Sequence, residues 1–265
     1  MKKFLAAAAA VFLIFGACSA AEISGNGFVE VEYMAYPEKG ESPNATQRVA
    51  EVMARRALVE QIGELYINSS TKIQQYFDGR EVNDAVVAKV EKVLQGSQVV
   101  TARQSDGSFR AVARLPIFGS DSLVNEILPE DIKPVEFLKP KFTNIESEIT
   151  QNYEGGIAQD YTGLIVDCSG QELSTAVLPT IKMLDGTEIY SFRNVKRQFV
   201  VNRGLAGYSD SAENGVERVG NNPLVVKAVF VENCDAVVSD DDANKILAAN
   251  QRSKFLNKCL VIFVR

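Results

Sequence analysis

The sequence contains no histidine and no tryptophan. Without histidine the chain cannot use Ser-His-Asp or Cys-His catalysis, a histidine proton shuttle, or the imidazole ligands of most catalytic zinc sites. Without tryptophan it lacks the largest aromatic platform for stacking against a sugar, although eight tyrosines remain. No Cys-x-x-Cys pair occurs, and no nucleophile stands beside an activating base. We therefore expect no enzyme activity, no catalytic residues, no cofactor and no metal.

Basic residues are fewer than acidic ones: the chain has 28 Lys and Arg and 34 Asp and Glu, so its net charge is −6. No basic block interrupts this acidic balance, so nucleic acid is not an expected partner. Only one apolar run is long, and it lies at the N-terminus, so no further segment is expected to span a membrane. The hydrophobic content of 46% is nevertheless ordinary for a globular protein with a buried core.

The N-terminal 21 residues have the pattern of an export signal. Lys2 and Lys3 precede an apolar run from Phe4 to Phe15, and small residues follow. Phe15-Gly16-Ala17-Cys18 resembles a lipobox, which predicts cleavage before Cys18 and lipidation of that cysteine. Ser19-Ala20-Ala21 offers an ordinary signal peptidase site as the alternative. We expect export to the periplasm, with an anchor in the outer membrane if Cys18 carries lipid.

Three cysteines then remain in the folded chain, namely Cys168, Cys234 and Cys259. In an oxidising compartment an odd number of cysteines suggests one disulfide and one spare thiol. Cys234 and Cys259 are the candidate pair, because a helix between them could return the chain and place their flanking strands side by side. Three buried free thiols are the open alternative.

Residues 22–128 have the pattern of a compact α+β domain. Alternating or β-rich runs predict strands, and apolar residues at helical spacing predict helices. The Asp106-Gly107 turn between two β-rich runs predicts a hairpin. The predicted strands are 27–36, 65–77, 97–103 and 109–117, and the predicted helices are a long one capped by Asn44 and closed by Gly63, then 83–95 and 121–128.

Three prolines and a Gly-rich polar stretch mark residues 129–160 as a linker or an extended wrap. Residues 161–265 then predict a second α+β domain, with Ser239 as the N-cap of a helix whose first turn is acidic. We expect two domains, each an antiparallel or mixed sheet covered by helices. The predicted strands are 163–168, 179–184, 188–190, 195–201, 224–231 and 260–264, the last of them central.

Two polar segments of the second domain are candidate sites. The loop from Arg218 to Pro223 has turn residues at Gly220, Asn221 and Asn222, and Arg218 could hold a carboxylate of a partner protein. Ordering of the turn is the alternative role for Arg218. Asp235 and Asp240–Asp242 are acid-rich but lack the EF-hand pattern, so a helix N-cap explains these acids better than a calcium site.

Two sets of segments carry a family resemblance. The helix Asn44–Gly63, the Ser/Thr-rich strand after it, the valine-rich helix and the Gly107 hairpin resemble the N-terminal module of the LPP-twenty-like lipoprotein family and the N-terminal domain of flagellar assembly protein T. The second set is similar to the C-terminal half of exported bacterial proteins with the same N-terminal module. It comprises Tyr161–Asp167, Pro179-x-Ile181, Asp185–Tyr190, Arg218–Ala228 and Ser239–Ala243.

The resemblance implies a protein of the cell envelope. It would act in envelope or flagellar-associated assembly through contacts with other envelope proteins or with copies of itself. A periplasmic module that binds a small ligand or a peptidoglycan fragment between its two domains is the alternative.

Overall fold

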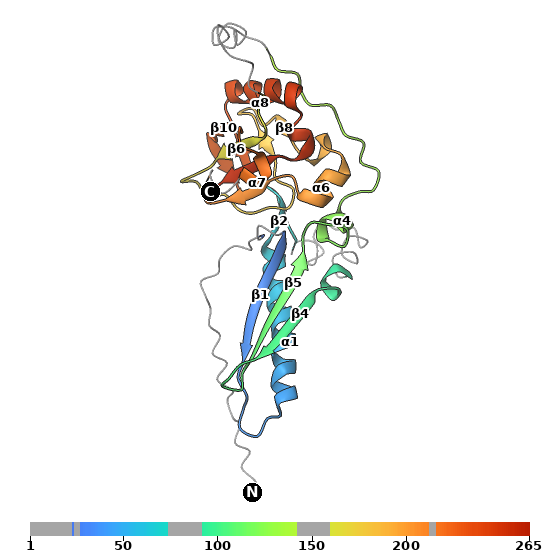
Figure 1. The fold of residues 1–265 in the computed structure, drawn as a ribbon. Helices are drawn as coiled ribbons and strands as arrows, with labels where there is room; N and C mark the ends of the chain where they lie inside the picture. The colour runs from blue at the N-terminus through green and yellow to red at the C-terminus, as the bar shows by residue number, and fades with distance from the viewer. Residues whose placement is uncertain (1–22, 24–26, 74–91, 142–159, 212–215) are drawn as a thin grey trace.

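The computed structural model describes residues 23, 27–73, 92–141, 160–211 and 216–265. An elongated N-terminal part extends from a rounder C-terminal part (Figure 1). Both parts combine helices with sheets, as the sequence predicts. Among the described residues, no helix is long and apolar enough to cross a membrane.

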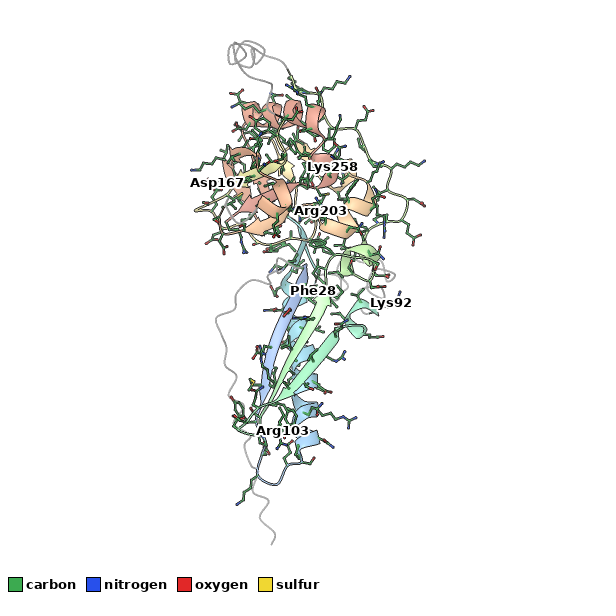
Figure 2. The ribbon with its side chains drawn as sticks, viewed as in Figure 1. Phe28, Lys92, Arg103, Asp167, Arg203 and Lys258 are labelled. Carbon is green, nitrogen blue, oxygen red and sulfur yellow. The ribbon has the colours of Figure 1, made fainter. Side chains whose placement is uncertain are left out.

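The N-terminal part is built on a three-stranded antiparallel sheet in the order β1-β5-β4. The bounds are Phe28–Ala35 for β1, Gln98–Arg103 for β4 and Phe109–Pro116 for β5. The predicted β4–β5 hairpin is confirmed, and its turn holds Gly107 at a φ of 86°. Figure 2 shows Phe28 at the end of the sheet nearest the C-terminal part and Arg103 at the far end.

One long helix, α1 (Pro43–Glu64), covers one face of this sheet (Figure 1). Its buried positions recur every four residues and are mostly small, which lets the helix approach the strands closely. They are Thr46, Ala50, Ala54, Leu58 and Ile62, and Gly63 beside the last of them is also buried. The predicted cap was wrong by two positions, because the Ser42 hydroxyl accepts the Ala45 N–H at 3.3 Å and Pro43 opens the first turn.

A short hairpin replaces the single strand predicted over residues 65–77. β2 (Tyr66–Asn68) and β3 (Thr71–Lys72) pair antiparallel. The chain turns between them because Asn68 Oδ1 accepts both the N–H and the hydroxyl of Ser70, each at 3.0 Å. Of the helix predicted over 83–95, residues 92–95 are helical and the rest lies outside the described residues.

The β2–β3 hairpin also joins the two parts of the molecule. The backbone carbonyls of Tyr66 and Ile67 accept the N–H groups of Val177 and Leu178, each at 2.8 Å. Nearby, Arg197 of the C-terminal part contacts α4 (Leu123–Ile127): its guanidinium donates a hydrogen bond to the Asn125 carbonyl at 2.6 Å. Buried side chains from both parts form one continuous hydrophobic cluster.

Residues 129–141 contain no helix or strand and run along the outside of the C-terminal part toward α8 (Asp240–Ser253) (Figure 1). The Phe137 ring stacks on Tyr190, with 6.5 Å between ring centroids. The Lys141 N–H donates to Asn244 Oδ1 on α8 at 2.8 Å. This stretch is therefore held against the core by specific contacts; residues 142–159 of the predicted linker lie outside the described residues.

The C-terminal part contains an all-parallel sheet, which corrects the prediction of only antiparallel or mixed sheets. Its order is β10-β6-β13-β9, and the bounds are Leu224–Lys227, Leu164–Asp167, Val261–Val264 and Gly207–Ser209. The two middle strands are almost entirely buried, as their unbroken apolar sequences favour in a parallel sheet. The prediction that the last strand is central is confirmed.

A second, mixed sheet has the order β11-β12-β7-β8. Its bounds are Phe230–Glu232 for β11, Asp235–Val237 for β12, Ile181–Lys182 for β7 and Glu188–Tyr190 for β8. The single strand predicted over 224–231 is instead divided between the two sheets. The other described helices of this part are η1 (Phe192–Asn194), α6 (Arg197–Arg203), α7 (Val216–Val219) and η3 (Leu256–Lys258).

The predicted strand over 195–201 was also wrong, because these residues lead into α6. Val200 and Val201 are buried on one face of the helix, so tertiary packing overrides their β propensity. Gly204 ends α6 at a φ of 74°. The N-cap of α8 is confirmed, since the Ser239 hydroxyl accepts the Asp242 N–H at 3.1 Å.

A substitution at Gly204 would test the packing between the two parts, because Gly204 lies against the Phe118 ring. A Cβ at this position would lie 2.6 Å from Phe118 Cε1, and the positive φ adds backbone strain. We expect Gly204→Ala to lower the free energy of unfolding by about 3 kcal/mol in urea titrations. Phe118→Leu removes the overlapping ring atoms, so the double variant should be less destabilised than the sum of the single variants by about 1 kcal/mol. Strict additivity would contradict the contact.

Candidate functional site

Arg218 faces the inside of the molecule, which corrects its assignment as a candidate partner contact. Its guanidinium donates to three backbone carbonyls: Cys259 at 3.1 Å, Arg203 at 2.8 Å and Gly204 at 2.7 Å. Burial lowers the pKa of this guanidinium from its ordinary value. The side chain therefore satisfies the carbonyls at the end of α6 and before β13, which is the turn-ordering role that the sequence left open.

The two asparagines of the same loop have different surroundings. Asn222 pairs with the start of the C-terminal part, because its N–H donates to Thr162 Oγ1 at 3.0 Å and Thr162 N–H donates to its carbonyl at 2.9 Å. Asn221 is exposed. Arg218, Asn221 and Asn222 thus do not converge on one binding surface.

The predicted Cys234–Cys259 disulfide does not form in the structure, where Cys168, Cys234 and Cys259 are all buried free thiols. Cys234 Sγ lies 3.7 Å from Asp235 Oδ1. Burial raises the pKa of Cys168 to about 12, and it also raises the pKa values of the other two thiols. Thiols in this state are poor nucleophiles. Cys18, the predicted lipidation site, lies outside the described residues.

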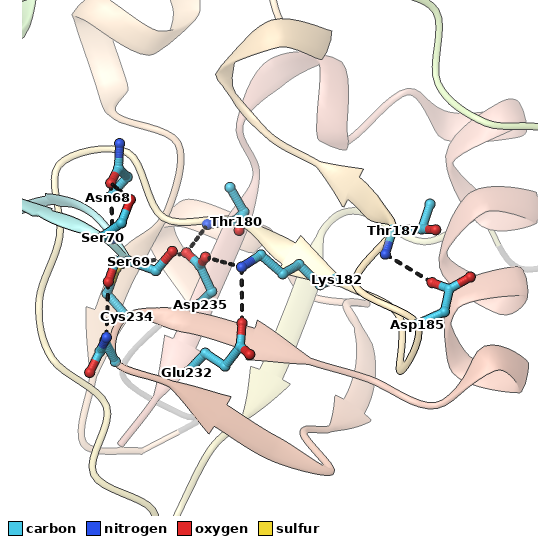
Figure 3. Close-up of polar contacts among 11 residues, drawn as sticks. Asn68, Ser69, Ser70, Thr180, Lys182, Asp185, Thr187, Glu232, Cys234 and Asp235 are labelled. Carbon is cyan, nitrogen blue, oxygen red and sulfur yellow. Dashed lines mark hydrogen bonds and ion pairs between the residues drawn. The ribbon is translucent and has the colours of Figure 1, made fainter.

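A polar cluster that sequence reasoning did not assemble lies where the β2–β3 hairpin meets the mixed sheet (Figure 3). It includes Asp235, whose predicted grouping with the acids of the α8 N-cap was wrong. Asp235 of β12 is 1% exposed, and Lys182 of the neighbouring strand β7 reaches it with an Nζ–Oδ2 distance of 2.8 Å. Lys182 Nζ also lies 3.0 Å from Glu232 Oε2. The second oxygen of Asp235 accepts the Thr180 N–H at 2.9 Å. A buried carboxylate is thereby fully paired.

The electrostatics of this cluster keep Lys182 protonated. Burial alone lowers its pKa, but the contacts with Asp235 and Glu232 outweigh burial, so the pKa is raised above its ordinary value of 10.5. A lysine held as an ammonium ion cannot attack a carbonyl group, because only the free amine is nucleophilic. No group of three or more His, Cys, Asp or Glu in the described ranges could hold a metal ion. The cluster is therefore suited to binding through hydrogen bonds.

A second surface of interest is the outer face of α1. Val49, Val52 and Val59 are 45%, 62% and 42% exposed, and Ala45 and Arg56 continue the same row. Successive members are three or four residues apart, so they lie along one face of the helix. Since the inner face already packs on the sheet, α1 carries apolar side chains on two sides.

The comparisons with known proteins concern the C-terminal part. Residues 163–265 match the family model described as the second domain of Treponema pallidum Tp0624. No curated protein matches the chain at a significant level. The matched segment contains the parallel sheet, the mixed sheet and the Lys182–Asp235 pair, but not the β2–β3 hairpin or α1.

Loss of Lys182 should be costly, because it would leave the buried Asp235 carboxylate with the uncharged donors Thr180 N–H and Cys234 Sγ but without its cation. We expect Lys182→Met to lower the free energy of unfolding by about 3 kcal/mol in urea at neutral pH. Lys245→Met is the matched control, since Lys245 pairs with Asp242 at the surface of α8 and should contribute less than about 1 kcal/mol.

The pH dependence of the free energy of unfolding provides a second measurement for the comparison of the wild type with Lys182→Met. Because the folded-state pKa of Lys182 is raised, its stabilising effect is complete below pH 10.5 and is lost as the pH rises through the folded-state value. The difference between the wild type and Lys182→Met should therefore shrink at strongly alkaline pH. Equal costs for the two lysine variants would show that the pair is not important for stability.

Proposed function

We propose that this chain is an exported cell-envelope protein that acts through protein–protein contacts, as an assembly or scaffolding component at the outer membrane. Two features support the proposal. One is the N-terminal sequence that predicts export and lipidation of Cys18. The other, which carries the argument, is the exposed row of valines on α1.

The α1 row has the spacing of a helix that packs against a second helix. Positions 45, 49, 52, 56 and 59 alternate steps of four and three residues, as in the contact seam of paired helices. A helix of 22 residues is about 33 Å long. It offers an extended strip for the apolar face of a partner helix, which is a common mode of recognition.

The surroundings of the row match an interface that forms and dissociates in water. Arg56 and Glu60 form an ion pair of 3.1 Å beside the valines, and both side chains are largely exposed. Arg56 within the row thus pairs with Glu60 at its edge, and this charged pair beside apolar positions resembles the mixture of polar and apolar groups in an interface that is not permanent.

An aspartate at Val52 should disrupt such an interface. Because this side chain is 62% exposed, we expect Val52→Asp to change the free energy of unfolding by less than about 0.5 kcal/mol. Cross-linking in the native envelope should lose at least about 90% of the higher-mass products, since the charge would have to be desolvated in the contact.

Val135→Asp provides the matched control, because Val135 is 61% exposed on the surface stretch 129–141 of the C-terminal part. It should leave the cross-linked products unchanged. Products made of two copies of this chain would identify self-association, and products with another envelope protein would identify a heterologous partner. Equal effects of the two variants, or no cross-linked product at all, would contradict a role for α1 in assembly.

The intact mass of the protein purified from native membranes tests the anchor. We expect a chain that begins at Cys18 and carries a diacylglyceryl and an acyl group, with its three other cysteines reduced. An unmodified chain that begins at Ala20 or Glu22 would contradict the anchor and make the protein periplasmic. A mass lower by two hydrogens would show a disulfide and would contradict the buried free thiols.

A further inference from the structure

The polar cluster at the junction surrounds a pocket of about 180 Å³. Its walls come from both parts of the chain, since the β2–β3 hairpin contributes three residues and the C-terminal part contributes the others. The residues central to the argument are Asn68, Ser69, Thr180, Lys182, Arg193 and Asp235. Figure 3 shows the hairpin residues facing Asp235 and Thr180. A ligand in this pocket would contact the two parts at once.

One wall of the pocket contains a hydroxyl group without a partner. Thr180 is 7% exposed, and its Oγ1 is buried without a hydrogen-bond partner, although its N–H donates to Asp235. Buried hydroxyls are normally paired, because an unpaired one loses its hydrogen bonds to water with no replacement. Thr180 lines the pocket, so a rotation of its side chain would bring this hydroxyl to a hydrogen-bonding ligand.

The hairpin provides a second free donor. Asn68 uses its Oδ1 to accept two hydrogen bonds from Ser70, and Figure 3 shows its amide nitrogen on the side away from Ser70. Within the described part of the chain, this nitrogen has no hydrogen-bond partner. Donors without partners thus occur on both sides of the junction.

Charges in the pocket walls are balanced, which restricts the ligand. The lining side chains are two cations, Lys182 and Arg193, and two anions, Asp235 and Glu188. Lys182 pairs with Asp235 and also with Glu232, which lies beside the pocket. Because the lining charges cancel and Lys182 is already paired, the site has no excess positive charge that would favour phosphate. Hydroxyl, amide and carboxylate groups in a neutral site suit a ligand that carries many hydroxyl groups.

We propose that the junction pocket binds a small uncharged polyhydroxylated molecule of about the size of a monosaccharide. In this arrangement Thr180 Oγ1 and the amide of Asn68 bind hydroxyl groups of the ligand, and the half-buried Phe192 offers an apolar surface to its carbon atoms. The ligand bridges the hairpin and the mixed sheet. The inference is independent of the α1 interface and holds whether or not Val52→Asp affects association.

Titration of the full exported chain, followed by amide NMR, tests the pocket. The probes are D-glucose, N-acetylglucosamine and glycerol, with inorganic phosphate as the charged comparator. We expect one of the neutral probes to give saturable shifts for residues 68–70 and 180–182, and phosphate to give none. Absence of saturable shifts with all three neutral probes would overturn the proposal, as would equal shifts with phosphate.

Two variants make the test specific. Thr180→Val keeps the shape of the side chain and removes the hydroxyl, so it should weaken binding about fivefold without destabilising the fold. Thr187→Val on the same β7–β8 hairpin lies outside the pocket and should leave the affinity unchanged. Equal affinities of the wild type and Thr180→Val would overturn the assignment of Thr180 to the site.

Discussion

Backbone pairing between β2 and residues 176–178 is the interaction on which the arrangement of the molecule depends. Two hydrogen bonds of 2.8 Å join β2 to Val177 and Leu178 of the C-terminal part, and Asn233 Nδ2 adds a third contact to the Ser69 carbonyl at 2.9 Å. The pairing places the hairpin against the mixed sheet, so that the two hydrophobic interiors become one cluster. Without it, the pocket would lose one of its walls, and the orientation of α1 would depend on the Phe118 and Arg197 contacts and on the hydrogen bond from Gly119 N–H to the Val201 carbonyl.

Two half-buried cations stabilise the C-terminal part in two places. Arg218 binds three carbonyls near the end of α6 and before β13, and Lys182 binds the Asp235 carboxylate. Each cation satisfies groups from different elements that would otherwise be buried without partners, which is where polar contacts matter most for stability. Arg218 and Lys182 therefore differ from Thr180 and Asn68. The Thr180 hydroxyl and the Asn68 amide nitrogen make no hydrogen bond among the described residues.

The sequence predicted local features well and long-range pairing poorly. The β4–β5 hairpin and the α8 cap follow from turn and capping residues close in sequence, and both are confirmed. The parallel pairing of β6 with β13 joins segments nearly a hundred residues apart, and a short apolar run does not specify its partner. The Lys182–Asp235 pair was missed for the same reason, since strand register, not spacing, brings the two together.

The two proposed surfaces are mechanically connected through one short segment. α1 ends at Glu64, Leu65 is its C-cap, and β2 begins at Tyr66, so no flexible linker separates the exposed valines from the pocket wall. Leu65 is buried, and its carbonyl accepts the Ile73 N–H at 3.0 Å, which fixes the hairpin to the helix end. A ligand that bridges Asn68 and Thr180 would therefore restrict the orientation of α1 relative to the C-terminal part. When α1 binds a partner, α1 loses freedom to reorient relative to the C-terminal part. A ligand in the pocket would already have removed part of this freedom, so the two binding events would be thermodynamically coupled.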